Sequence, residues 1–198
     1  MSVKWKMQRV AVVGHSFVNH LQTFMKKDVF VDDAFGLDNT RVEFIGVSGL
    51  TISKLRRVEH RVRNFKPTVV VVILGDNDIG NGVDQDLLTL RLTAAVTMLK
   101  AWAGAAKVIK IDICPRFCAQ SYKYYCASYE EVALAVNAGF REQVGEDVEG
   151  IYAWGCRGLS FHDARQVNWS GDGVHLKAAG NSLLYQGIRK ALQVFKHA

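Results

Sequence analysis

Two short motifs near the ends of the chain contain the residue types of a nucleophilic catalytic site. Gly14-His15-Ser16 follows the apolar run Val10–Val13, which places Ser16 at a strand-to-helix turn. Asp172 and His175 lie three residues apart, just before the last helical stretch. A serine hydroxyl needs a base to become a nucleophile, and the base needs a partner that orients it. The two motifs together supply all three groups.

Apolar runs that alternate with longer stretches of helical pattern predict the elements that position these groups. The runs suited to buried strands are Val10–Val13, Val42–Ile45, Val69–Leu74, Val108–Ile113 and a weaker Gly150–Ala153. The helical stretches are Phe17–Lys27, Thr51–Phe65, Asp84–Ala103, Tyr129–Val144 and Lys177–Phe195. Near-continuous apolar strands between helices are typical of a parallel sheet covered on both faces. We therefore predict one domain over residues 1–198, a three-layer, doubly wound, flavodoxin-like α/β fold with about five parallel strands.

This fold predicts where the chemistry takes place. In open parallel sheets the ligand site lies beyond the carboxyl ends of the strands. The loops after the first three strands begin with Gly14-His15-Ser16, Gly46-Val47-Ser48-Gly49 and Gly75-Asp76-Asn77-Asp78. We expect all three loops to open on one rim of the sheet, within reach of the loop that carries Asp172 and His175.

These motifs resemble the four sequence blocks of the SGNH hydrolases, also called GDSL-type esterases and lipases, in the same order and over nearly the whole chain. The family's third block, Gly-x-Asn-Asp, is matched by Gly75-Asp76-Asn77-Asp78. The glycine of the second block corresponds best to Gly49, with Gly46 as the alternative. The first block, usually Gly-Asp-Ser, corresponds to Gly14-His15-Ser16, and the last, Asp-x-x-His, to Asp172 and His175.

The resemblance implies a serine esterase that acts on a small or medium acyl ester through a covalent acyl-enzyme, without a metal or an organic cofactor. Ser16 would be the nucleophile, His175 the base and Asp172 the group that orients it. The oxyanion hole would comprise the backbone N–H groups of Ser16 and Gly49 and the side-chain amide of Asn77.

The chain departs from the family pattern at His15, which stands where the family has aspartate. Asp76 and Asp78 would add negative charge near a developing oxyanion if they faced inward, so we expect at least one of them to face away. Ordinary structural roles stay open for these motifs. Ser16 could cap the helix that follows it, and Asn77 could be a turn residue after its strand.

The excess of basic over acidic residues suggests a second hypothesis about the function. The formal net charge is +6, and Lys54, Arg57 and Arg61 would share one face of the helix predicted there. Such a face could meet nucleic acid or another anionic surface, or could simply be solvated. The chain also resembles the esterase domains in the first-frame proteins of some LINE-type retrotransposons. The alternative function is therefore a non-catalytic or weakly active SGNH-fold module in a nucleic-acid-associated protein.

The remaining expectations concern environment and access to the site. No apolar run approaches the roughly 20 residues of a membrane helix, and we expect an intracellular, cytoplasmic protein. Cysteines 114, 118 and 126 lack the paired spacing of zinc ligands, so we interpret them as reduced, small buried side chains. The aromatic segment Pro115–Tyr129 is a candidate substrate lid, or a surface loop packed by its own aromatic rings.

Overall fold

The computed structural model describes residues 7–104, 107–117, 128–145 and 150–195. The strands are β1 (Gln8–Gly14), β2 (Thr40–Gly46), β3 (Val69–Ile73), β4 (Lys107–Ile111) and β5 (Ile151–Trp154). The helices are α1 (Ser16–Lys27), α2 (Arg56–Phe65), α3 (Asp76–Gly80), α4 (Gln85–Ala103), α5 (Ser128–Val144) and α6 (Ala178–Phe195), with short 3-10 turns η1 (Ile52–Lys54) and η2 (Gln166–Asn168). Over these ranges no helix is both long and apolar enough to cross a membrane.

The five strands form one parallel sheet in the order β2-β1-β3-β4-β5. This order confirms the predicted doubly wound, flavodoxin-like α/β fold. The chain winds outward from β1 in both directions, so β1 is the topological switch point, beside which ligands of such folds bind. Ser16 follows directly after the carboxyl end of β1.

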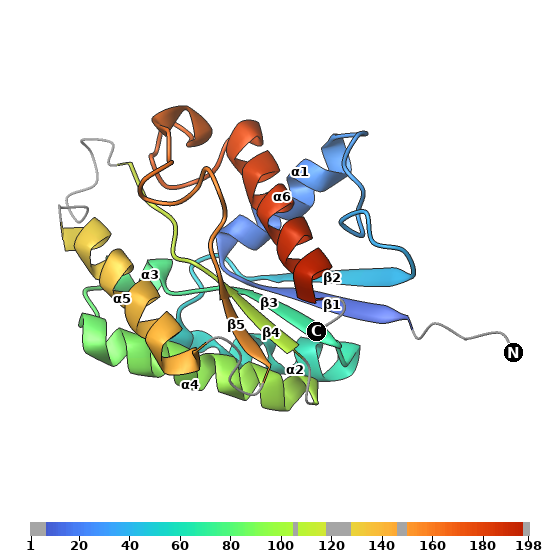
Figure 1. Ribbon diagram of the computed structural model, residues 1–198, viewed down its shortest axis with the longest axis horizontal. Coiled ribbons are helices and arrows are strands. Elements are labelled where there is room, and N and C mark those ends of the chain that lie inside the picture. Colours follow the sequence, from blue (N-terminus) through green and yellow to red (C-terminus); the bar gives the residue numbers. More distant parts are fainter. Residues whose placement is uncertain (1–6, 105–106, 118–127, 146–149, 196–198) are drawn as a thin grey trace, which may run out of the picture.

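Helices cover both faces of the sheet and divide the core in two (Figure 1). Helices α1 and α6 pack on the face that Val10 and Val12 present. Helices α2, α4 and α5 pack on the opposite face, which Ala11 and Val13 present. All four of these β1 side chains are fully buried. Burial on both faces explains why the strand reads as a continuous apolar run.

Three local features differ from the sequence expectations. The stretch predicted as one helix from Thr51 starts as the 3-10 turn η1, and α2 begins only at Arg56. The short helix α3 was not predicted, because its five residues are too few to show a helical period. Inside β4, Lys110 is only 2% exposed, and its ammonium group donates to the carbonyl of Ile111. Burial lowers the pKa of Lys110, and the nearby Asp112 partly offsets that effect.

The close approach of β1 to β3 generates a stability prediction at Gly14. A Cβ atom added there would overlap the backbone carbonyl oxygen of Ile73, so a Gly14→Ala variant must push the two strands apart. We expect it to lower the free energy of unfolding by about 2 kcal/mol or more. Urea denaturation followed by circular dichroism measures this. Gly171 is the matched control because nothing surrounds its added Cβ, and equal losses in the two variants would contradict the prediction.

Candidate active site

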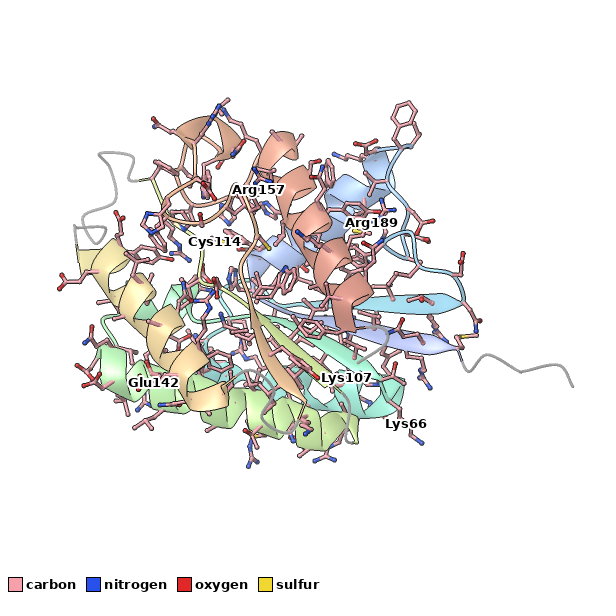
Figure 2. The ribbon with its side chains drawn as sticks, viewed as in Figure 1. Lys66, Lys107, Cys114, Glu142, Arg157 and Arg189 are labelled. Carbon is pink, nitrogen blue, oxygen red and sulfur yellow. The ribbon has the colours of Figure 1, made fainter. Side chains whose placement is uncertain are left out.

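The two chain-end motifs meet at the carboxyl end of the sheet. Ser16 is the first residue of α1, and its Oγ lies 3.1 Å from His175 Nε2. The other ring nitrogen of His175, Nδ1, lies 2.6 Å from Asp172 Oδ2. Figure 2 orients this end of the sheet, since it shows Cys114 beyond the carboxyl end of β4 and Lys107 at the start of that strand. Ser16, His175 and Asp172 therefore form one hydrogen-bonded chain.

Asp172 is held in its ionised form by donors from its own loop. Its Oδ1 accepts the hydroxyl of Ser170 and the backbone N–H groups of Val174 and His175, the last two at 2.9 Å. Partial burial would raise the pKa of Asp172, but these donors and the His175 ring together hold it well below its usual range. An ionised carboxylate only accepts hydrogen bonds, so His175 Nδ1 carries a proton. In the neutral ring the lone pair is then on Nε2, which faces the Ser16 hydroxyl.

The capping role that was open for Ser16 belongs to its neighbour. His15 is the N-cap residue of α1, and its Nδ1 accepts the backbone N–H of Phe17 at 3.5 Å. The Ser16 hydroxyl is thus not used to cap the helix. As the first residue of α1, Ser16 also has a backbone N–H without a helical acceptor, which is a typical anion-binding group.

The two candidate glycines of the second block have different environments. Gly46 ends β2, and a Cβ there would overlap the Asn19 side-chain oxygen on α1. Gly49 has a positive φ of 67°, and nothing lies within 4 Å of its added Cβ. It sits in the turn in which the Leu50 N–H bonds to the Val47 carbonyl. Gly46 therefore serves helix packing, whereas Gly49 borders open space in a conformation that favours glycine.

Asn77 is held in a fixed orientation by two neighbours. Its Nδ2 donates to the Leu50 carbonyl at 3.0 Å, and its Oδ1 accepts from Arg116 at 3.2 Å. A primary amide has two N–H donors, and within the described part of the chain only one of them has a protein acceptor. Sequence reasoning missed Arg116, because no motif links a residue after β4 with one after β3. The Asn77 amide is the third candidate donor for an oxyanion, beside Ser16 and Gly49.

A buried contact joins the loop of Ser16 to the loop of Asn77. His15 Nε2 lies 2.9 Å from Asp76 Oδ2, and the two side chains are 1% and 2% exposed. The Tyr129 hydroxyl lies 3.4 Å from the other Asp76 oxygen. Burial would raise the pKa of Asp76, but His15 and two nearby cations hold it well below its usual range. The aspartate that the family places at position 15 is thus replaced here by a histidine that faces a carboxylate from the next loop.

Asp78 has its own partner, so both acids beside Asn77 are accounted for. Its two carboxylate oxygens lie 3.1 and 3.3 Å from the backbone N–H of Ile52, in η1. Burial raises the pKa of Asp78 to about 6, and the Ile52 donor counteracts this only in part. Both carboxylates are therefore directed at protein groups. This agrees with the expectation that at least one would turn away from a developing oxyanion.

A second histidine stacks on His175. His20 lies one helical turn after Ser16 on α1, and its ring centroid is 4.6 Å from that of His175, with 24° between the planes. Partial burial lowers the pKa of His20, and His175 lowers it further. Sequence reasoning missed this contact between His20 and His175. The only sequence signal for it is the four-residue spacing from Ser16, which places both side chains on one helix face.

Two expectations at the edge of the site stay predictions. Of the proposed basic face, Lys54 lies in η1 and Arg57 in α2, while Arg61 binds Glu43 and the Phe44 carbonyl. No observation tests a nucleic-acid contact. The proposed lid falls mainly on residues 118–127, which lie outside the described part of the chain. Within the described start of the proposed lid, the Phe117 N–H donates to the carbonyl of Gly173.

The buried contact of His15 with Asp76 predicts a non-additive mutant cycle. His15→Leu leaves the Asp76 carboxylate buried without its main donor, and we expect a loss of about 3 kcal/mol or more in the free energy of unfolding. In an Asp76→Asn background the same change should cost clearly less, because a neutral amide is cheaper to bury than a charge. Urea denaturation of the four proteins measures both steps. Equal costs in the two backgrounds would contradict the proposed charge effect.

The raised pKa of Asp78 predicts a pH effect of opposite sign to that of most acids. The folded protein holds this proton up to about pH 6, whereas an unfolded chain releases it near pH 4. The contribution of Asp78 to stability is thus fully present below about pH 4 and is lost as the pH rises through 6. Asp78→Asn removes this dependence. We expect the variant to gain stability relative to wild type between pH 4 and pH 7, and a constant difference in urea midpoints would refute this.

Comparisons with known proteins agree with the fold and the motifs. A family model described as the GDSL-like lipase/acylhydrolase family matches residues 19–183. A GDSL-like lipase from Bacteroides thetaiotaomicron is 19% identical, with a TM-score of 0.72 over 95% of this chain and 89% of that one. A lipase/acylhydrolase from Enterococcus faecalis is 18% identical, with a TM-score of 0.70 over 95% and 96%. A carbohydrate esterase of family 3 from Talaromyces cellulolyticus is 20% identical, with a TM-score of 0.64 over 97% and 100%.

A comparison with curated protein sequences gave no match. The solved structures show a shared fold at low identity. The family model carries more weight, since it spans most of the chain, including the loops of Gly49 and Asn77 and both Asp172 and His175. Its span begins shortly after Ser16, so the first block lies just outside it. The chain belongs to the GDSL-like lipase/acylhydrolase family and is a carboxylic ester hydrolase by that membership.

Proposed function

We propose that the protein is a serine esterase in which Ser16, His175 and Asp172 act as the catalytic triad on a small or medium acyl ester. The observation that carries this proposal is the hydrogen-bonded chain from Ser16 Oγ to His175 Nε2, at 3.1 Å, and from His175 Nδ1 to Asp172, at 2.6 Å. Both distances lie in the range that proton transfer through a histidine requires. Membership in an acylhydrolase family supports the same reaction class.

In the first half of the reaction, His175 Nε2 takes the hydroxyl proton while Ser16 Oγ attacks the acyl carbon. The carbonyl oxygen becomes negative in the tetrahedral intermediate. The N–H groups of Ser16 and Gly49 and the free N–H of Asn77 are the donors available to it. Because Leu50 and Arg116 already fix the Asn77 amide, little reorganisation is needed as the charge develops.

In the second half, the protonated His175 returns its proton to the leaving alcohol, and the acyl group stays on Ser16 Oγ. A water molecule then loses a proton to His175 and attacks the acyl carbon, and His175 passes that proton to Ser16 Oγ as the acid is released. Asp172 remains ionised throughout. It stabilises the imidazolium that forms twice in each cycle, and its low pKa suits that role.

The proposed substrate class rests on the structural relatives more than on the triad, because one fold can carry many activities. Among the structural relatives, one is a lipase and another a carbohydrate esterase. We propose a small or medium acyl ester, either the acetyl ester of a sugar or a lipid ester. The loops around the site determine which of these two esters binds, because the triad itself acts on the carbonyl group that both contain.

The test is hydrolysis of p-nitrophenyl acetate by the wild type and by a Ser16→Ala variant. Removal of the nucleophile should lower kcat by about 10³-fold or more, as for other triad serines. Ser182→Ala on α6 is the matched control, since the hydroxyl of that serine accepts a hydrogen bond from the exposed Gln186, and it should retain full activity. A Ser16→Ala protein that is folded and hydrolyses the ester at the wild-type rate would overturn the proposal.

A further inference from the structure

A groove beside His175 extends along α1. It has a volume of about 630 Å³, which is within the usual range for small-molecule sites. It lies between the second half of α1, the loop that follows and the first turn of α6, two helices that run side by side above the sheet in Figure 1. We call it the α1–α6 groove, and the residues considered below are His20, Thr23, Phe24, Val29, Phe30 and Ala178.

The lining of the α1–α6 groove combines exposed apolar side chains with the polar side chains of Lys27, Asp28 and Asn181. Val29 and Phe30 are 90% and 95% exposed, the highest values among the large apolar side chains described. Exposed apolar area is unfavourable in water, and a contiguous patch of it commonly marks a binding site. Phe24 forms a half-buried part of the same wall. The groove is therefore suited to an apolar chain.

His20 makes the groove continuous with the reacting groups. It forms one end of the groove, and its ring stacks on His175 at 4.6 Å. From His20 to Lys27 the helix rises about 10 Å, which is the length of a medium alkyl chain. A larger cavity, of about 800 Å³, lies at the start of β1 and β2, beside Met7 and Thr40. That cavity is at the opposite end of the sheet from Ser16, so it offers no path to the triad.

The chemistry decides which part of an ester lies nearest to His20. His175 Nε2 must reach the leaving oxygen in order to return its proton, whereas the oxyanion faces Gly49 and Asn77. The alcohol portion therefore starts next to His175 and continues most directly past His20. We infer that the α1–α6 groove binds the alcohol portion of the ester, and that this portion carries an apolar chain of medium length. This inference rests on the proposed function.

The experiment varies the two halves of the ester separately. In wild type, kcat/KM for hexyl acetate should exceed that for ethyl acetate by about tenfold or more, since each methylene that leaves water contributes about two- to fourfold. Thr23→Trp fills the groove and should lower this ratio at least fivefold. Phe30→Ala removes an apolar side chain that is 95% exposed, so the folded protein loses little packing. This variant should lower the hexyl-to-ethyl ratio two- to fivefold.

The controls are matched in structure. Thr97 on α4 is, like Thr23, an exposed helical threonine whose hydroxyl donates to the carbonyl four residues before it. Thr97→Trp and Leu90→Ala, both on the far face, should leave the hexyl-to-ethyl ratio unchanged. The ratio of kcat/KM for ethyl hexanoate to that for ethyl acetate tests the acyl part of the ester. This acyl ratio should be the same in the groove variants as in wild type. A drop in that acyl ratio in Thr23→Trp, or an unchanged hexyl preference, would overturn the inference.

A binding measurement separates the groove from the catalytic proposal. Titration of ¹⁵N-labelled protein with 1-hexanol should shift the backbone amide signals of Thr23 and Ala178 in wild type and in Ser16→Ala. The shifts should disappear in Thr23→Trp. If no ester is hydrolysed but these shifts appear, the triad proposal fails while the groove stands as an alkyl-alcohol site. If turnover is normal and the shifts are absent, the groove inference fails alone.

Discussion

Three successive residues at the start of α3 connect the loops on which the site depends. Asp76 faces His15 in the loop after β1, while Asn77 and Asp78 bond to Leu50 and Ile52 after β2. Asn77 also accepts from the segment after β4. Strand pairing alone brings these loops to one rim, but it does not fix them to one another. The short helix does, with contacts of 2.9 to 3.2 Å.

The same cluster explains how two acids are accommodated beside Asn77, the proposed oxyanion donor. A carboxylate near an oxyanion hole would oppose the charge that develops there. Asp76 is ionised but accepts from His15, and Asp78, whose pKa lies near 6, is partly protonated around that pH. In this chain the histidine at position 15 thus has a buried carboxylate partner at position 76.

The sequence predicted the parts of this protein that local patterns encode. Continuous apolar runs marked the strands to within about two residues, and short motifs identified Ser16, Asp172 and His175 as groups that would meet. Contacts between distant loops were not visible in any local pattern. Arg116 on Asn77 and Asp76 on His15 follow from the strand order, and each partner is ordinary by itself. The burial of Lys110 could not be predicted from its apolar neighbours, because lysine side chains are usually exposed.

The pairing of the two chain ends sets the order in which a competent molecule forms. Ser16 and His175 are separated by 159 positions, and α6 packs beside α1 on the face of the sheet that β1 and β3 share. During synthesis the amino-terminal part emerges first, and its apolar face stays uncovered until the last helix has left the ribosome. A chain that has been made only as far as β5 therefore contains Ser16 but not His175. The hydrogen bond between Ser16 and His175 therefore forms only once α6 has been made and has packed on the sheet.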